Sequence, residues 1–425
     1  MKEDFIHYLW KFKQFDCQNI STINGDVLKV LDFGKHNQQH SGPDFFNAQI
    51  QLGHEKWAGN VEMHLKSSDW YVHKHEEDTA YDNVILHVVW EHDVDVFRKD
   101  GSKIPALNIA DFTDKGQLQK YQALITKQRS EWIYCEDHFS KFDDFLLDSW
   151  LERVFIERLE QKSKLIYRLL NKSTNNWDEV LFKLLAKNFG LNINGNVFLE
   201  MAESIPFKVI QKTAASQQQL EALLFGQLNL LNETIEEPYY QNLQKEYHFL
   251  RHKYQLKQSL SSQPQFFRLR PGNFPTIRIA QLATLYHKHD HLFNKLTRIS
   301  ELKEVKSTFK ISASEFWRNH YTFSTKSKPG KRQLSPKFID LLLINTFVPL
   351  RFAYAKSKGY DENDLLIDFM TSIASEKNQI ISKFEKLRKG VSRNALHSQA
   401  LKQLKTNYCD LQGCLNCNLG IAYLK

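Results

Sequence analysis

The sequence predicts an α+β protein in which an N-terminal domain built on a mixed β-sheet precedes a mostly α-helical region. Two observations support this fold class. Short runs of β-branched and aromatic residues, separated by Gly, Asn and Asp turn signals, dominate residues 26–109. After about Asp111, apolar residues instead recur at helical spacing. Because 425 residues exceed the length of one typical domain, we expect two or three cores.

The first hundred residues alternate between helix-like and strand-like patterns. Residues 3–15 predict an amphipathic helix, because their apolar residues share one face. The strands expected from alternating or continuous apolar runs span residues 26–34, 44–52, 56–66 and 82–90. Residues 67–81 begin with the N-cap types Ser and Asp and predict a short helix or an irregular crossover. Residues 91–109 extend the sheet with a hairpin that turns at residues 99–101.

The rest of the chain is predicted to be helical. The helices expected from apolar periodicity span residues 142–171, 177–190, 217–231 and 239–256. The second of these ends at Gly190, which suits a helix C-terminus. We therefore expect three domains. They are an α/β domain over residues 1–112, a helical domain over residues 113–260, and a basic helical region over residues 261–425.

Hydropathy predicts a chain that does not enter a membrane. A membrane span needs about 18 consecutive apolar residues. The most apolar stretch, which begins at Phe338, is interrupted by Asp340, Asn345, Pro349 and Arg351. The first residues carry charges throughout and have no continuous apolar centre of the kind that a secretory leader has. We therefore expect a cytoplasmic location, while the sequence leaves the oligomeric state open.

Two carboxylates mark the candidate active site. Asp44 opens one predicted strand and Glu62 lies in the next, so antiparallel pairing would bring them to the same edge of the sheet. Paired carboxylates suit Mg²⁺ or Mn²⁺, and such an ion activates water against a phosphate. Because strand side chains alternate, His64 and Lys66 share a face with Glu62. The alternative is structural: both acids terminate strands and pair with nearby Lys or His side chains.

This pattern resembles the PD-(D/E)xK nuclease superfamily, whose restriction-endonuclease-like core runs helix, three-stranded meander, helix, strand. Pro43 and Asp44 match its PD element, and Glu62 matches its second acid. His64 stands where the superfamily has lysine, and Lys66 would replace that lysine only if the strand bulges. The resemblance implies a metal-dependent nuclease with Asp44, Glu62, His64 and Lys66 as its catalytic residues.

Histidines are dense in the same region and offer a second interpretation. His73 and His75, with Asp78, could build a zinc site with Glu62 and His64. That site would make the protein a zinc-dependent enzyme acting on a small molecule. The alternative is a set of exposed histidines at a crossover, with His87 hydrogen-bonded in the core because it lies in an apolar strand.

The middle of the chain is strongly basic. Residues 241–300 hold ten Lys and Arg against two Asp and Glu, and residues 301–358 hold twelve against four. The residues predicted to bind nucleic acid through its phosphates are Arg268, Arg270, Arg278, Lys328, Lys331 and Arg332. Phenylalanines beside the first three could stack on bases. Alternatively, the first arginines tie helices together and the second run is merely solvated.

Three of the five cysteines cluster near the end of the sequence. Cys409, Cys414 and Cys417 have a C-x4-C-x2-C spacing that can wrap zinc or an iron–sulfur cluster. The fourth ligand would be Cys135, or else Cys17 or His397. Buried free thiols are the alternative. Some members of the nuclease superfamily carry an iron–sulfur cluster on one upstream and three C-terminal cysteines, which this arrangement resembles in outline.

Over its full length the chain resembles a bacterial domain-of-unknown-function family. The stretches that carry this resemblance are "GPDFFNAQI", "WAGNVEMHLKSSDW", "YDNVILHVVW", "RPGNFPTIRIAQLA" and the "YC…CLNC" tail. The functional hypothesis is a metal-dependent nuclease or a nuclease-derived nucleic-acid-processing protein. Its rivals are a catalytically inactive nucleic-acid-binding or scaffold protein and the zinc-dependent enzyme described above.

Overall fold

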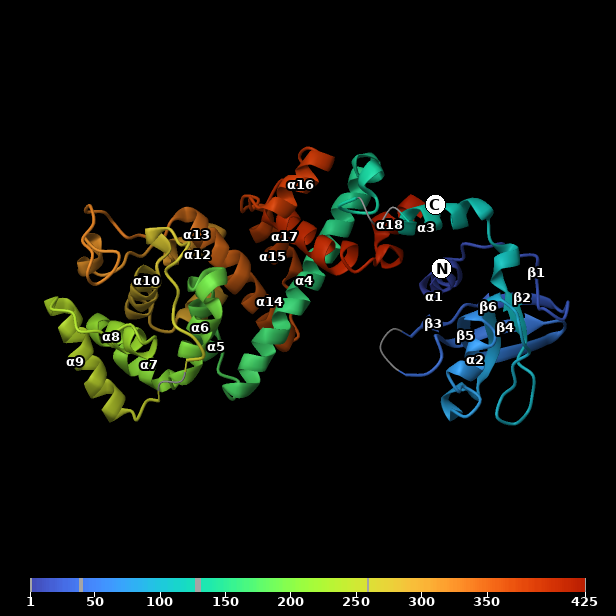
Figure 1. Cartoon of the computed structure of the whole chain (residues 1–425), viewed down its shortest axis with the longest axis horizontal. Helices are drawn as coiled ribbons and strands as arrows, with labels where there is room; N and C mark the ends of the chain where they lie inside the picture. Colours follow the sequence, from blue (N-terminus) through green and yellow to red (C-terminus); the bar gives the residue numbers. More distant parts are fainter. Residues whose placement is uncertain (1, 38–40, 127–130, 258–259, 425) are drawn as a thin grey trace. The chain divides into compact units, whose positions relative to one another are not determined.

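The structure is a computed structural model that describes residues 2–37, 41–126, 131–257 and 260–424. It divides into two compact units (Figure 1). Unit 1 comprises residues 1–150 and 404–425, and unit 2 comprises residues 151–403. The bounds of these units differ from those of the three predicted domains. In particular, the cysteine-rich tail belongs to the unit that contains the sheet.

A mixed β-sheet forms the centre of unit 1, as predicted. Its strands are β1 (Ile20–Ser21), β2 (Val27–Asp32), β3 (Lys35–His36), β4 (Phe45–Leu52), β5 (Glu55–Lys66), β6 (Val84–Glu91) and β7 (Ala106–Asn108). They lie in the order β1-β2-β4-β5-β6-β7, with β3 also pairing with β4. The pairs β1–β2, β2–β4, β3–β4 and β4–β5 are antiparallel, whereas β5–β6 and β6–β7 are parallel.

Helices cover this sheet on both faces. The helices of unit 1 are α1 (Glu3–Lys11), α2 (Asp69–Val72), α3 (Lys115–Thr126) and α18 (Asn418–Leu424), together with the start of α4 (Asp144–Lys172). The buried face of α1 packs with Val61 and Met63 of β5, and Ile421 and Leu424 of α18 join the same core. Trp70 of α2 belongs to a second, smaller cluster. The α+β class is therefore confirmed.

The segment between β6 and β7 differs from the predicted hairpin. A turn does form at residues 99–101, where Phe97 bridges Lys103. β7, however, runs parallel to β6, with His87 paired to Ala106. Pro105 has no N–H to donate to a ladder, and β7 begins only after it. The crossover at residues 67–81 has the expected form, a short α2 followed by the 3-10 turn Thr79–Tyr81.

Unit 2 is helical, as predicted. After α4 its helices are α5 (Trp177–Phe189), α6 (Leu191–Ser204), α7 (Phe207–Thr213), α8 (Gln217–Gln227), α9 (Pro238–Lys253), α10 (Pro275–Lys288), α11 (Leu292–Arg298), α12 (Leu302–Thr308), α13 (Pro336–Leu342), α14 (Val348–Ser357), α15 (Asn363–Thr371), α16 (Gln379–Leu387) and α17 (Ala395–Leu404). Among the described residues, Pro336–Ser357 is the one helical run long and apolar enough to cross a membrane. Its most apolar window is 78% buried inside the protein, as in a core helix.

Candidate metal site

Asp44 and Glu62 meet where β4 begins opposite β5. Because Phe45 pairs with Val61, the residue before β4 lies across from Glu62. The backbone N–H of Asp44 donates to Glu62 Oε2 over 3.1 Å, and the N–H of Met63 donates to Asp44 Oδ2 over 3.0 Å. The strand pair itself therefore holds these two carboxylates together.

α1 adds a histidine and a third acid to this pair. His7 Nε2 lies 3.2 Å from Asp44 Oδ2. Glu3 lies close enough for its pKa to rise through its own burial and through the charge of Asp44. Glu3 and His7 are four residues apart and therefore share a face of α1. Neither residue was predicted from the sequence, although their spacing on the first helix is a signal that points to them.

His64 stands at the centre of a chain of imidazoles. It is 1% exposed and shares a face of the sheet with Glu62, as the strand alternation predicts. Its Nδ1 lies 2.8 Å from Nε2 of the buried His87, and its Nε2 lies 3.0 Å from Nδ1 of His73. A His64 that donates from Nδ1 to His87 would keep the lone pair of Nε2 directed toward His73.

His75 links these imidazoles to the acid pair. Its Nε2 lies 3.3 Å from Glu62 Oε1, and the Nε2 of His64 lies 3.7 Å from the same oxygen. The ring of Tyr81 stacks on His75 with centroids 3.8 Å apart. His64, His73 and His75 offer ligand nitrogens within 4.8 Å of one another. We call these three residues the imidazole trio.

Burial sets the protonation of the site. It raises the pKa of Glu62 to about 9, and the charge of Asp44 adds to this rise. It lowers the pKa of His64 to about 3, with further lowering by His75 and His73. Burial also disfavours charge on His7, but the hydrogen bond and charge of Asp44 outweigh it, so the pKa of His7 is raised. Oxygen and imidazole ligands gathered in a partly buried, acid-rich site fit a divalent cation.

Lys66 does not join these residues. Its Nζ lies 3.5 Å from Glu91 Oε1, and its side chain is 53% exposed. The register between β5 and β6 shifts only before Val61 and is regular from Glu62 to Lys66. No bulge therefore turns Lys66 toward Glu62. Asp78 caps the 3-10 turn at residues 79–81 by accepting from the N–H of Ala80.

The six predicted nucleic-acid ligands divide into two groups in unit 2. Arg268, Arg270, Lys328 and Lys331 are exposed. Arg278 is 5% exposed, donates to Gln281 Oε1 over 2.9 Å, and lies 3.4 Å from the ring centroid of Phe338. Arg332 donates from Nε to the carbonyl of Trp317 over 2.9 Å and lies over the ring of Tyr321. These two arginines therefore serve packing. The structural alternative expected this of Arg278, but it expected Arg332 to be solvated.

The three clustered cysteines meet Cys135 in one pocket of unit 1. The pocket is lined by Ile133, Tyr134, Cys135, Phe139, Leu404, Tyr408, Cys409, Cys414, Cys417, Leu419 and Gly420. Burial raises the pKa of Cys414 to about 12, and the neighbouring Cys417 adds to the rise. The same two causes raise the pKa of Cys135 and of Cys409. Cys17 and His397 do not line this pocket.

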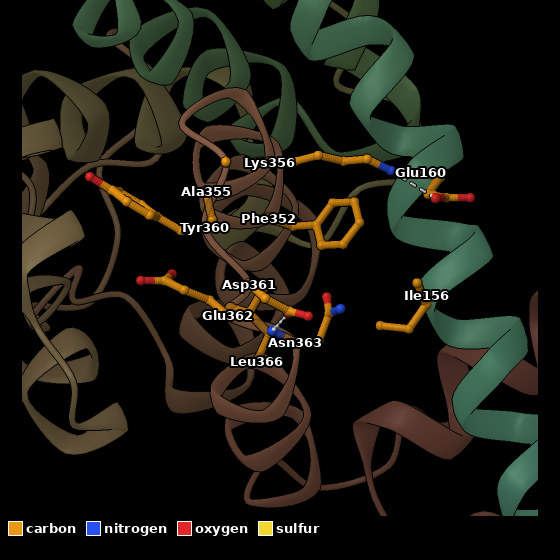
Figure 2. A pocket seen from close by; sticks show the side chains of 11 residues that line it. Ile156, Glu160, Phe352, Ala355, Lys356, Tyr360, Asp361, Glu362, Asn363 and Leu366 are labelled. Carbon is orange, nitrogen blue, oxygen red and sulfur yellow. Dashed lines mark hydrogen bonds and ion pairs between the residues drawn. The ribbon is translucent and has the colours of Figure 1, made fainter.

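Unit 2 contains a second hollow, of about 250 Å³, between α4, α14 and α15 (Figure 2). Its charges are paired within the protein. Lys356 Nζ lies 2.9 Å from Glu160 Oε1, which Figure 2 marks with a dashed line. Glu362 accepts from Arg351 Nε over 2.7 Å. These side chains already satisfy one another, so the hollow is a weaker candidate than the acid pair and the imidazole trio.

Comparison with known families places this site in context. The profile of one family matches residues 3–379 of the chain. The chain belongs to the family described as Protein of unknown function (DUF2851). The matched region includes the acid pair, the imidazole trio and the exposed cations, and it ends before Cys409. No curated protein and no solved structure matches the chain.

Proposed function

We propose that the protein is a metal-dependent phosphodiesterase that acts on nucleic acid. The observation that carries this proposal is the interlocked pair of Asp44 and Glu62, joined through the N–H groups of Asp44 and Met63. The element order also supports it: α1, the antiparallel strands β2, β4 and β5, the crossover helix α2, and the parallel strand β6. This order resembles that of the PD-(D/E)xK core, in which Asp44 and Glu62 would occupy the acidic positions.

Asp44 and Glu62 would hold Mg²⁺ or Mn²⁺, with the imidazole trio beside them. The bound ion would supply an acidified water and polarise the phosphate. Glu62, whose carboxyl lies in a buried setting, would give up its proton when a cation binds. Because its pKa is low, His64 stays neutral and can orient a water molecule through a ring nitrogen.

His7 offers the positive charge that the nuclease superfamily takes from lysine. Lys66 pairs with Glu91, and His64 is kept neutral, so neither supplies that charge at the acid pair. The hydrogen bond to Asp44 and the charge of Asp44 raise the pKa of His7. A protonated His7 would stabilise negative charge on a phosphate next to Asp44. In unit 2, the exposed Arg268, Arg270, Lys328 and Lys331 would contact phosphates of the nucleic acid.

Cleavage assays test this function. The full-length protein is incubated with fluorescently labelled single-stranded DNA, duplex DNA or RNA and with Mg²⁺ or Mn²⁺. Asp44→Asn and Glu62→Gln preserve the shape of each side chain and one of its acceptor oxygens but remove the charge. We expect cleavage by the wild type and a loss of activity of about 100-fold or more in each variant, because a carboxylate that binds the metal ion would be missing.

Glu91→Gln is the matched control. Glu91 is an acid of the same sheet, 59% exposed, and paired with Lys66 away from the site. This variant should cleave like the wild type. Absence of cleavage by the wild type across all substrates and metals would refute the proposal. Binding without cleavage would instead favour an inactive nucleic-acid-binding protein.

A zinc-dependent hydrolase of a small molecule is the second candidate, because the imidazole trio is preassembled beside Glu62. Elemental analysis of the purified chain, together with His73→Ala and His75→Ala, separates the two candidates. Zinc bound in equal amount to the protein, lost in both variants but kept in Asp44→Asn, would favour this function. A zinc content that is the same in His73→Ala, His75→Ala and the wild type would exclude the zinc-dependent hydrolase.

A further inference from the structure

Four of the five cysteines of the chain converge in unit 1 from two distant segments. Cys135 precedes the 3-10 helix Glu136–Lys141, and the others lie between Lys405 and α18. All four line one pocket whose remaining walls are largely apolar. The segments are separated by more than 250 residues of sequence, so their meeting is a product of the fold of unit 1.

The backbone of the tail is folded tightly to bring its sulfurs to this pocket. The N–H of Gly413 donates to the carbonyl of Tyr408 over 2.8 Å, and the N–H of Cys417 donates to the carbonyl of Cys414 over 3.2 Å. Gln412 adopts a left-handed conformation with φ of 61°. Gly420 of α18 packs so closely that a Cβ there would lie 2.2 Å from the carbonyl oxygen of Cys414. A left-handed residue and a glycine are thus used to place Cys414.

We propose that these four cysteines ligate an iron–sulfur cluster that fastens the C-terminal tail to unit 1. Four thiolates on one centre are the usual ligand set of such clusters. The cluster would join Cys135 to a tail that otherwise depends on the short α18 and its few apolar contacts. This site is separate from the acid pair, and it can exist whether or not the protein cleaves nucleic acid.

The four sulfurs are not gathered as the ligands of a single zinc ion would be, which favours a cluster. Zinc holds sulfur at about 2.3 Å, which sets tetrahedral sulfur ligands about 3.8 Å apart. Among the described residues, the imidazole trio forms a group that could hold one metal ion, and these four sulfurs do not form such a group. A cluster separates its thiolates more widely than one ion does, because several iron atoms lie between them.

The test uses the full-length chain, purified without oxygen from cells supplied with iron. Iron, zinc and acid-labile sulfide are measured together with the visible absorption spectrum. We expect iron and sulfide in comparable molar amounts, with a visible band that fades on reduction. Cys414→Ser should lose the band and most of the iron. Cys17→Ser is the matched control, because Cys17 lies outside the pocket and its thiol donates to the carbonyl of Phe15.

A second measurement does not depend on any variant folding. The wild type is treated with a thiol alkylating reagent before and after removal of the metal by a chelator, and labelling is read by mass spectrometry. The pocket cysteines should be protected several-fold in the loaded protein and become labelled after chelation, while Cys17 labels equally in both. Zinc as the only bound metal, no metal at all, or equal labelling in both states would overturn the proposal.

Discussion

Nδ1 of His64 lies 2.8 Å from Nε2 of His87, and both imidazoles are buried, at 1% and 0% exposure. β5 and β6 are parallel here, with Glu62 paired to His87, so both histidines lie on the face that carries the acid. Partners of this kind fix the tautomer and the ring orientation of a ligating histidine. His87 is therefore positioned to orient His64 toward the other two histidines of the imidazole trio.

Replacing His87 by Phe should weaken both the fold and any metal site. The buried Nδ1 of His64 would lose its partner, so we expect the free energy of unfolding to fall by about 1–3 kcal/mol. The affinity for a bound transition metal should fall by roughly 10–100-fold. Urea denaturation and equilibrium dialysis measure the two effects. His54→Ala, at the exposed β4–β5 turn, is the control and should change neither.

Glu221 gives unit 2 a pH-dependent stability. Burial raises its pKa to about 7, although the hydroxyl of Tyr239 donates to it and opposes the rise. The folded state therefore holds a proton that the unfolded state releases near its ordinary pKa of 4.5. The contribution is complete below pH 4.5 and is lost as pH rises through about 7, at up to about 1.4 kcal/mol per pH unit. Thermal melts from pH 4.5 to 8 should show this decline in the wild type.

Glu221→Gln is the comparison for that decline. It keeps an acceptor for Tyr239 but does not titrate, so the part of the decline due to Glu221 should disappear. Identical slopes for the wild type and the variant between pH 4.5 and 7 would show that Glu221 does not have the raised pKa assigned to it.

Mutations in the two groups of basic residues should have different effects, on nucleic-acid binding for the exposed group and on stability for the group that serves packing. Replacing Arg268 and Arg270 by Gln should leave the melting temperature unchanged. It should also reduce the salt dependence of DNA binding, by about 0.9 in the slope of log K against log salt for each lost phosphate contact. Arg278→Gln should instead lower the stability of unit 2 by about 1–3 kcal/mol, because the buried Gln281 and the half-buried Asn273 lose their donor. Fluorescence anisotropy and thermal melts give the two results. An Arg278 variant that melts normally but binds weakly would reverse this assignment.

The close packing of α8 on α9 predicts an intolerant glycine. A Cβ at Gly226 would lie 2.2 Å from the ring of Tyr247, which is 2% exposed and cannot move aside. Gly226→Ala should therefore cost about 1–3 kcal/mol despite the better helix propensity of alanine. Gly272→Ala is the control, since nothing lies within 4 Å of its Cβ position. Urea titration measures both, and adding Tyr247→Leu should recover part of the loss.

Local patterns predicted the strands and the longest helix closely, because they depend on periodicity alone. The runs at residues 44–52, 56–66 and 142–171 correspond to β4, β5 and α4 within a few residues. The placing of Asp44 opposite Glu62 also followed from simple pairing. What remained hidden depends on tertiary packing. The burial of Arg278 against Phe338 could not be predicted from the neighbouring residues, since a buried and an exposed arginine look the same in a sequence.

The residues of the candidate metal site and of the cysteine pocket also depend on tertiary packing. His7 reaches Asp44 only because α1 lies against the sheet, and Lys66 turns to Glu91 because β6 ends beside it. The fourth cysteine of the pocket was one of three candidates from spacing, and only the three-dimensional fold distinguishes Cys135 from Cys17 and His397. Distances along the chain do not determine which of several equivalent side chains is brought near.

Because unit 1 is assembled from both ends of the described chain, its completion is delayed during synthesis. Residues 151–403 must be made before residues 404–425 emerge. At a ribosomal rate of about 5–20 residues per second, that interval is roughly 10–50 s. Throughout it, the apolar surface that later receives Ile421 and Leu424 has no tail to cover it. A nascent chain would therefore expose this surface to chaperones until residues 404–425 have been made, and only then could unit 1 close.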